Sequence, residues 1–449
     1  MDGQVGAEEL EAYSRTVRKL RALPVDDLVR LHAERVAESF VNEGRRRRRQ
    51  TRKDGIRAED AAVRAATGTG AADRREDAPL APAAAPGSSV GAYRQSRRCY
   101  VCKSTFSTVD AFYHALCPSC AAENREHREA GTDLRGRRAL LTGGRVKIGF
   151  QLALMLLRDG AELTVTSRFP QDTVRRFRAA PGSAEWLDRL TVAGIDLRDP
   201  RQVLGLCEQL RSEGRPLDIL VNNAAQTVRR APGAYAVLAA GEREPLEPHG
   251  PRLLEAPGFR TGRELAPARR EQSALALLTD EAGLLPDTAP ENSWSARLGE
   301  LDPAELLETH LVNAVAPTLL CDRLLPLLLA SPHPRRYIVN VTAVEGRFAV
   351  RNKTGGHPHT NMAKAALNML TRTSAEELAA QGVHLSSVDT GWITDENPAP
   401  KKARIAEHGF RTPLDIVDGA ARVYDPIVRG EAGRPVSGAF LKDYRVADW

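Results

Sequence analysis

From Arg138 onward the chain alternates between short apolar runs and longer segments with apolar residues three or four positions apart. The short runs predict buried strands: RALLTGG, AELTVTSR, LDILVNN, RRYIVNVTA and VHLSSVDTG. The longer segments predict helices, and the two longest cover residues 302–329 and 361–382. Because buried strands that alternate with helices form a parallel sheet covered on both faces, we predict an α/β fold with a doubly wound parallel sheet.

The first hundred residues have a different pattern. Residues 8–42 carry leucine, valine and alanine at helical spacing on both sides of Pro24, which predicts an N-terminal helical segment of two short helices within residues 1–44. Residues 45–96 begin with a basic run and continue as an Ala/Pro/Gly-rich tract without apolar periodicity. That composition predicts a flexible linker.

Three further segments follow this linker. Residues 97–130 form a small cysteine-containing module, and residues 135–449 form the predicted α/β domain. Inside that domain, residues 228–300 are rich in Pro, Gly, Arg and Glu and are too long for an ordinary connection. They predict an insertion beside the functional site.

The cysteine-containing module holds two C-x-x-C pairs in the stretch CYVCKSTFSTVDAFYHALCPSC. Each pair lets two thiolates converge from one turn, and two pairs can complete a tetrahedron around zinc. Because four thiolates leave no coordination position open, the expected role of the zinc is structural, in a module like a zinc ribbon, and the alternative is four unligated thiols. The predicted ligands are Cys99, Cys102, Cys117 and Cys120. His114 is a neighbour that a catalytic zinc could use.

The composition fits a folded chain of two or three domains, since 42% of the 449 residues are hydrophobic. The formal net charge is only +6, which does not favour nucleic acid as the main partner. The run Arg45–Arg49 lacks interleaved aromatic residues, so we interpret it as a solvated tether, with RNA, DNA or an acidic partner as alternatives. No N-terminal run resembles a signal peptide, and Asp322 and Arg323 interrupt the richest apolar stretch. We therefore expect a cytoplasmic protein without a membrane span.

A glycine-rich turn, LLTGGRVKIG, follows the first strand of the α/β domain. Glycines at such a turn let the backbone approach a pyrophosphate, and the following helix N-terminus attracts its charge. The turn is followed, in order, by NNAA after a later strand, an asparagine in the next helix, a lysine-containing helix and DTGWIT. With these motifs in this order, the chain from about Arg135 to its end resembles the short-chain dehydrogenase/reductase family. The resemblance implies a Rossmann-type fold, a nicotinamide nucleotide and oxidoreductase chemistry.

The resemblance also implies which residues bind the cofactor. Lys147 stands where the family's T-G-x-x-x-G-x-G turn has its middle glycine, and it either reaches a phosphate or narrows the approach. Asp196 falls where the family binds adenine, and Thr394 falls beside the nicotinamide carboxamide. The implied set is Thr142, Gly143, Gly144, Lys147, Ile148, Gly149, Ser167, Arg168, Asp196, Asn222, Asn223, Ala224, Lys364, Gly391 and Thr394.

The second strand of the α/β domain is followed by Ser167 and Arg168. No acid stands there to accept hydrogen bonds from an unphosphorylated ribose, whereas an arginine suits a 2′-phosphate. The resemblance therefore favours NADP over NAD, and the alternative for Arg168 is a solvated surface side chain.

The catalytic positions depart from the family. Lys364 and Asn313 match its lysine and asparagine, but Ala343 stands at the serine position and Thr360 at the tyrosine position. A threonine hydroxyl is far less acidic than a phenol, whose pKa is about 10. His357 stands seven residues before Lys364, at the spacing that the enoyl reductase branch uses for its tyrosine, and is the candidate substitute acid. The alternative is a polar histidine of the glycine-rich loop GGHPHT without a catalytic role.

Three hypotheses of function follow. The first is an atypical NADP-dependent oxidoreductase acting on an unknown carbonyl, alcohol or enone, with a histidine, the insertion or the substrate supplying the proton. The second is a catalytically inactive nucleotide-binding pseudoenzyme that acts as a redox sensor or scaffold, with a protein partner at the cysteine-containing module. The third is non-redox lyase or isomerase chemistry. Because Lys364 and Asn313 are retained, the first is favoured, and the family's habit of dimerising implies a homo-oligomer.

Overall fold

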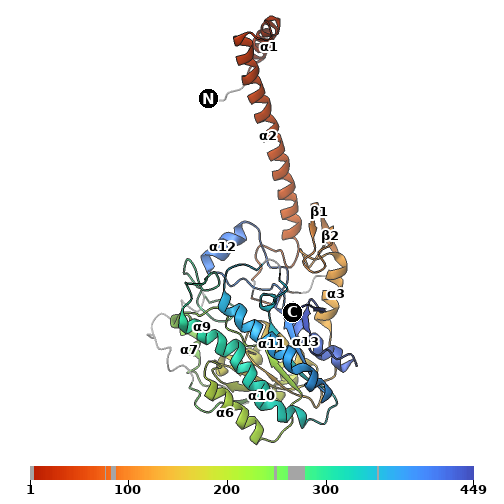
Figure 1. The fold of residues 1–449 in the computed structure, drawn as a ribbon, viewed down its shortest axis with the longest axis vertical. Coiled ribbons are helices and arrows are strands. Elements are labelled where there is room, and N and C mark those ends of the chain that lie inside the picture. Colours follow the sequence, from red (N-terminus) through yellow and green to blue (C-terminus); the bar gives the residue numbers. More distant parts are fainter. Residues whose placement is uncertain (1–4, 76, 82–86, 247–249, 261–278, 351–352) are drawn as a thin grey trace.

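The computed structural model contains an α/β domain, a small module beside it and a long helical arm (Figure 1). It describes residues 5–75, 77–81, 87–246, 250–260, 279–350 and 353–449. The helical arm consists of α1 (Ala7–Ala22) and α2 (Leu28–Ala65). The cysteine module consists of β1 (Ser89–Arg98), β2 (Thr105–Asp110) and α3 (Pro118–Glu129).

A nine-stranded sheet in the order β11-β10-β9-β8-β6-β3-β4-β5-β7 forms the centre of the α/β domain. All of its pairings are parallel except the one between β10 and β11. The strands are β3 (Arg138–Leu141), β4 (Glu162–Ser167), β5 (Leu190–Gly194), β6 (Ile219–Asn222), β7 (Arg252–Glu255), β8 (Arg336–Thr342), β9 (Val383–Asp389), β10 (Phe440–Lys442) and β11 (Arg445–Ala447). The predicted doubly wound, Rossmann-type sheet is confirmed.

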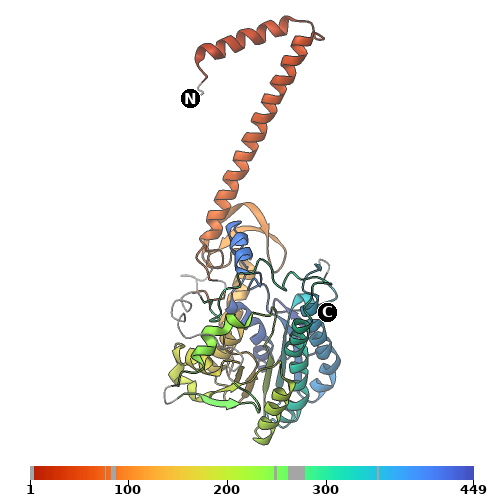
Figure 2. The same cartoon turned by 90° about the vertical axis from the view of Figure 1, so that its left-hand side faces the viewer.

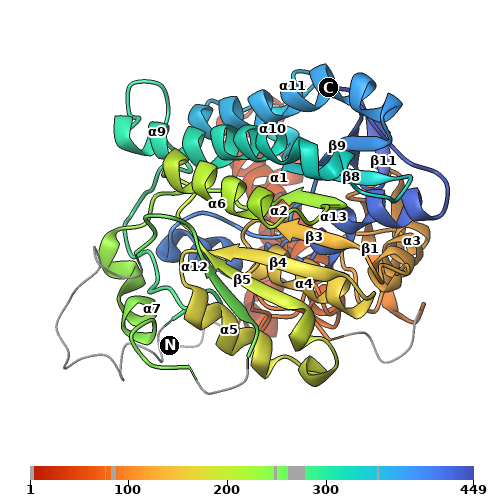
Figure 3. The same ribbon diagram turned by 90° about the horizontal axis from the view of Figure 1, so that it is seen from below.

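Helices cover both faces of this sheet (Figure 3). Side chains alternate across β3, so that Leu141 lies in one apolar core with α4, α5 and α13, and Leu140 lies in a second core with α6, α10 and α11. The helix bounds are α4 (Lys147–Arg158), α5 (Pro170–Ala179), α6 (Pro200–Ser212), α10 (Ala316–Leu329), α11 (Pro358–Ala380) and α13 (Ile416–Glu431). Shorter helices are α7 (Ala236–Gly241), α9 (Pro303–His310) and α12 (Ala399–Glu407), and a π-helical turn, Leu311–Val315, joins α9 to α10.

The run Pro303–Leu329 is the one described segment that is long and apolar enough to cross a membrane, with a mean hydropathy of 1.4 over its best window. Half of that window is buried inside the fold. Since α10 packs against α6 on the sheet, the run behaves as a core helix.

The flexible linker predicted to begin at residue 45 is wrong for residues 45–65. After Asp27 caps its N-terminus, α2 continues for 38 residues through the run Arg45–Arg49 and projects from the rest of the molecule (Figure 2). Arginine, glutamine and alanine are good helix formers, and Arg47 pairs with Glu43 one turn earlier at 2.6 Å. The polar composition correctly indicated that this segment is exposed to solvent, but it wrongly indicated that the segment is a flexible coil.

The end of the predicted linker is also part of a regular element. Strand β1 begins at Ser89, inside the predicted linker, and the backbone N–H of Arg94 donates to the buried carboxylate of Asp60 on α2 at 2.7 Å. The C-terminal turn of α2 thus belongs with the cysteine module.

The segment predicted as an insertion, residues 228–300, contains α7 and β7. Strand β7 pairs in parallel with β5 and extends the sheet by one edge strand. Residues 247–249 and 261–278 of this segment lie outside the described residues.

Candidate functional site

A cleft of about 1000 Å³ opens at the carboxyl ends of the parallel strands. Open α/β sheets bind their ligands at this edge. The glycine turn, the ends of β4, β6, β8 and β9, the start of α11, part of the insertion and one residue of the cysteine module line it. From the cofactor set implied by the family resemblance, the lining residues are Gly143, Lys147, Ile148, Gly149, Ser167, Arg168, Asp196, Asn223, Ala224, Lys364, Gly391 and Thr394.

Three residues of that set lie behind the surface of the cleft. The Thr142 hydroxyl accepts hydrogen bonds from the backbone N–H groups of Asn223 and Ala224, both at 3.0 Å, and so holds the glycine turn to the end of β6. Asn222 donates to the Oδ1 of Asn340 in the sheet at 2.8 Å. Gly144 packs against Val165, and a Cβ at this position would lie 2.6 Å from the Val165 Cβ.

At two positions of the glycine turn, Gly143 and Gly149, a residue with a side chain would cause backbone strain or a clash. Gly143 has a φ of 71°, in the left-handed region. A Cβ at Gly149 would lie 2.0 Å from the Gly143 carbonyl oxygen and 2.6 Å from the Asn223 Nδ2. The first turn of α4 therefore lies directly against the preceding loop, with its N-terminus facing the cleft.

Lys147, at the position of the family's middle glycine, also adopts a left-handed conformation, with a φ of 55°. Its Nζ lies 3.2 Å from the carboxylate of Asp77, a residue that precedes the cysteine module. Burial alone would lower the pKa of Lys147, but Glu396 and Asp77 outweigh it and raise this pKa above its usual value. The ammonium is thus engaged by acids at the wall of the cleft.

Arg168 lines the cleft beside Tyr235. Its guanidinium lies 4.9 Å from the centre of the Tyr235 ring, and its Nη2 donates to the Tyr235 hydroxyl at 3.3 Å. Ser167, beside it, is buried, and its hydroxyl accepts from the Phe169 N–H. Within the described ranges Arg168 forms no ion pair with a carboxylate, so its charge is available to an anionic ligand.

The neighbouring charged groups are paired. Arg145 lies 2.8 Å from Asp172. The Asp196 carboxylate accepts from the side chain of Arg198 at 2.5 to 3.1 Å, and Arg198 offsets the effect of burial so that the pKa of Asp196 is lowered. Asp196 therefore reaches the cleft with its carboxylate already held by an arginine.

The catalytic positions Lys364, Thr360 and Ala343 line the same cleft. The Lys364 Nζ donates to the Val341 carbonyl at 2.8 Å, and burial lowers the pKa of Lys364 to about 8. Thr360, one turn earlier in α11, has a buried hydroxyl with no partner among the described residues. Ala343 also lines the cleft and offers no hydrogen-bonding side chain. The usual hydroxyl pair of the family is thus missing.

Asn313 lies in the π-helical turn rather than on the cleft surface. Its Nδ2 donates to the Gln226 carbonyl at 2.8 Å, and its Oδ1 accepts from the Gln226 N–H at 2.7 Å. These two hydrogen bonds clamp the loop that follows β6. The catalytic role that the family resemblance implies for Asn313 remains a prediction.

His357 lines the cleft at the start of α11 and stacks on Trp294 from the insertion, with ring centres 4.0 Å apart. Because a carbonyl only accepts hydrogen bonds, the Nδ1 of His357 donates to the Trp294 carbonyl at 2.8 Å. Its Nε2 is therefore the ring nitrogen left for a ligand. His359, by contrast, lies in a separate pocket of about 290 Å³, and burial lowers its pKa.

Three polar residues are of particular interest among the cleft residues that were not expected from the sequence. Tyr100 comes from the cysteine module, Lys442 comes from the end of β10, and Glu345 lies two residues after Ala343. Burial raises the pKa of Glu345, and the nearby charge of Asp389 acts in the same direction. The motif VTAVEG contains Glu345, so a search for acids near the serine position could have found it.

The four cysteines converge in the cysteine module. Their Sγ atoms all lie within 4.8 Å of one another, with 3.6 Å between Cys102 and Cys117. Tetrahedral Zn–S bonds of about 2.3 Å place sulfur atoms about 3.8 Å apart, so the arrangement fits a four-thiolate metal site. His114 is outside the cluster, since its Nδ1 bonds to the Thr69 hydroxyl at 2.7 Å and burial lowers its pKa to about 3.

The fold defines an α/β protein of the doubly wound class, with an open cleft at the carboxyl ends of its parallel strands. The sequence matches the family profile for short chain dehydrogenase over residues 137–236 and the profile for enoyl-(acyl carrier protein) reductase over residues 269–412. The chain belongs to the short-chain dehydrogenase/reductase family.

Two curated proteins are similar to this chain in sequence. Uncharacterized protein R665 of Acanthamoeba polyphaga mimivirus is 32% identical over 345 residues, which cover 74% of this chain and 71% of that protein. The C-signal protein of Myxococcus xanthus is 31% identical over 126 residues, which cover 28% of this chain and 74% of that protein.

Solved structures with a similar fold include the RhlG–NADP complex of Pseudomonas aeruginosa, at 20% identity and a TM-score of 0.45, covering 69% of this chain and 95% of that one. The carbonyl reductase Sniffer of D. melanogaster is similar at 19% identity and a TM-score of 0.45, covering 70% of this chain and all of that one.

The lowered pKa of Lys364 predicts a pH dependence of stability. The folded state releases this proton near pH 8, below the usual lysine value, so the unfolded state binds more protons between about pH 8 and 10. The unfolding free energy of the wild type should therefore rise with pH relative to that of Lys364→Met. Urea unfolding at pH 7 and pH 9 measures the difference. The matched control is Lys19→Met on the exposed face of α1. The difference in unfolding free energy between the wild type and this control should be the same at pH 7 and pH 9. A change with pH as large as that for Lys364→Met would contradict the lowered pKa of Lys364.

Proposed function

We propose that the chain binds NADP(H) in the cleft and catalyses hydride transfer to or from a carbonyl, alcohol or enone substrate. The observation that carries the proposal is the continuous open cleft of about 1000 Å³, which joins the glycine turn, Arg168, Lys364 and His357. A cleft filled by side chains of the insertion would have favoured a pseudoenzyme. Instead Trp294 and other described residues of the insertion form a wall and leave the interior open.

The chain's own groups fit the parts of the nucleotide. The N-terminus of α4 and the glycine turn would face the pyrophosphate. Arg168 would bind the 2′-phosphate, because its guanidinium has no carboxylate partner among the described residues. Lys364 would hold the nicotinamide ribose, and the loop from Gly391 to Thr394 would face the carboxamide. When bound, the nicotinamide would supply the hydride for reduction of a carbonyl or enone, or accept it from an alcohol.

The proton has to come from a group other than a tyrosine. The Nδ1–H of His357 is held by the Trp294 carbonyl, so a second proton on this ring would lie on Nε2 in the cleft. Stacking on Trp294 fixes the plane of the ring. We assign His357 the role of general acid and Lys364 that of a cation near the developing negative charge.

The pseudoenzyme alternative has one observation in its favour. The Lys364 ammonium is held by the Val341 carbonyl, and no acidic hydroxyl lies one turn away at Thr360. A lysine in this position can hold a ribose without assisting catalysis, so the alternative predicts nucleotide binding without turnover.

We also propose that the cysteine module holds a structural zinc ion. Three of the four cysteines are buried, and four thiolates close the coordination shell. Reduced cysteines in this arrangement suit the cytoplasm, which is the location we propose.

The choice of cofactor can be tested by isothermal titration with NADPH and NADH. Arg168→Ser should weaken NADPH binding by about tenfold or more, since charge-assisted hydrogen bonds to a phosphate are lost, and should leave NADH binding unchanged. Arg201→Ser, which removes an exposed arginine paired with Asp199, is the matched control. Equal weakening of both nucleotides would exclude a 2′-phosphate site, and no binding of either would end the oxidoreductase proposal.

Turnover can be tested by following NADPH oxidation with a panel of ketones, aldehydes and enones. His357→Asn should lower the rate by about a hundredfold or more, as expected for loss of a general acid, with NADPH affinity retained. His359→Asn should keep wild-type activity, since His359 lies in the separate pocket. Full activity of His357→Asn would refute its role, and absence of turnover by the wild type with the whole panel would favour the pseudoenzyme.

Elemental analysis of the purified chain tests the zinc proposal. We expect about one zinc ion per chain in the wild type, and loss of that ion with lower thermal stability in Cys120→Ser. Cys207→Ser, which changes a buried cysteine of α6 outside the module, should keep the metal. A wild-type protein that carries no zinc and unfolds at the same temperature with and without added zinc would refute the site.

A further inference from the structure

The cysteine module contributes a side chain to the cleft of the α/β domain. Tyr100 stands between the first two cysteines, and its hydroxyl accepts a hydrogen bond from the backbone N–H of Trp392 at 2.9 Å. Trp392 follows Gly391 in the loop after β9, and a Cβ built on Gly391 would lie 3.5 Å from the Tyr100 hydroxyl oxygen. The Tyr100 ring therefore lies directly against this loop, which we call the nicotinamide loop (residues 389–394).

The cysteine turns fix the position of Tyr100. Its backbone N–H donates to the Ala115 carbonyl at 2.8 Å, and the N–H of Cys99 donates to the Ser104 carbonyl at 2.8 Å. The N–H of Cys117 in turn donates to the Cys99 Sγ at 3.3 Å. The two turns that supply the thiols thus also hold the tyrosine, and a metal bound by all four thiols would lock them together.

An apolar cluster joins the module to the nicotinamide loop. Cys99, Cys117 and Cys120 are buried in it together with Ile393 of the nicotinamide loop. Ile148 from the first turn of α4 packs against the same cluster. The interior of the module is therefore continuous with the first turn of α4 and with the nicotinamide loop.

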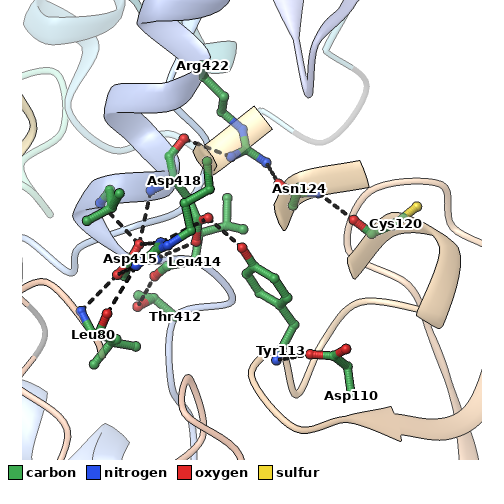
Figure 4. A network of polar contacts seen from close by, with 12 residues as sticks. Leu80, Asp110, Tyr113, Cys120, Asn124, Thr412, Leu414, Asp415, Asp418 and Arg422 are labelled. Atoms are coloured by element: carbon green, nitrogen blue, oxygen red, sulfur yellow. Dashed lines mark hydrogen bonds and ion pairs between the residues drawn. The ribbon is translucent and has the colours of Figure 1, made fainter. Parts of the chain in front are cut away.

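Buried polar contacts also join the cysteine module to α13 and to its N-cap residue, Asp415 (Figure 4). The Tyr113 hydroxyl of the module donates to Asp418 of α13 at 2.6 Å, and Arg422 of α13 donates to the Asn124 side chain of α3 at 2.8 Å. Arg128 of α3 donates to both oxygens of Asp415, at 2.5 and 2.9 Å. Because removing one partner of a buried ion pair is costly, these contacts favour a single docked orientation of the module.

We propose that Tyr100 is a positioning residue for the nicotinamide loop and that the metal-loaded cysteine module completes the nicotinamide end of the cleft. The inference rests on the proposed binding of NADP(H). It goes beyond that binding because it makes a segment outside the family's α/β domain part of the cofactor site. Affinity for the nicotinamide half of the nucleotide then depends on Tyr100 and on the metal, whereas affinity for the adenosine half does not.

The test compares NADPH with adenosine 2′,5′-bisphosphate, which carries the adenosine and 2′-phosphate but no nicotinamide. Titrations use the full chain as wild type, Tyr100→Phe and Tyr93→Phe. Tyr93 is a matched control because it is buried in the same module, and its hydroxyl bonds to the His114 carbonyl at 2.8 Å, away from the cleft. Loss of one hydrogen bond in Tyr100→Phe should weaken NADPH binding by about threefold to tenfold and leave the bisphosphate unchanged.

A second arm removes the metal from the wild type with a chelator and repeats both titrations. NADPH should weaken at least as much as in Tyr100→Phe, the bisphosphate should bind as before, and added zinc should restore NADPH binding. Unchanged NADPH binding in Tyr100→Phe, or an equal loss of both ligands in Tyr100→Phe or on chelation, would overturn the inference. If neither ligand binds the wild type, the proposed function itself fails, and the two failures are thus distinguishable.

Discussion

The close approach of the first turn of α4 to the loop before it is the constraint on which the cleft depends. No side chain fits at Gly149, since a Cβ there would lie 2.0 Å from the Gly143 carbonyl oxygen. Asn223 and Thr142 bind the same loop to the end of β6, so the turn, the sheet edge and the helix N-terminus form one rigid unit. This unit forms one wall of the cleft, and the remaining walls are built around it.

The side chains that line the cleft differ from the family's usual set, and several of them come from other segments of the chain. The serine and tyrosine positions hold Ala343 and Thr360, which supply little acid–base chemistry. Groups from three other places have come to the same cleft: His357 held by Trp294 of the insertion, Lys442 of β10, and Tyr100 of the cysteine module. We explain these observations by one proposal, in which the α/β domain keeps the cofactor site and the added segments complete it.

The sequence predicted the parts of this structure that depend on local pattern. Apolar periodicity predicted five strands of the sheet, β3, β4, β6, β8 and β9, and the long helices between them, whereas the strands β5, β7, β10 and β11 were not predicted. The four-cysteine cluster follows from spacing. It did not predict that α2 runs through Arg45–Arg49, because polar composition indicates exposure and does not distinguish a solvated helix from a coil. Nor could it place Tyr100 in the cleft, since that contact joins residues 292 positions apart and depends on how the module docks on α13.

The most direct test of this account is a crystal structure of the zinc-loaded chain with NADP⁺. We predict the 2′-phosphate within hydrogen-bonding distance of the Arg168 guanidinium, the nicotinamide against the loop from Gly391 to Thr394, and the Tyr100 hydroxyl still bonded to the Trp392 N–H. A nucleotide bound with its nicotinamide outside the cleft, or a cleft that excludes the nucleotide altogether, would contradict the account.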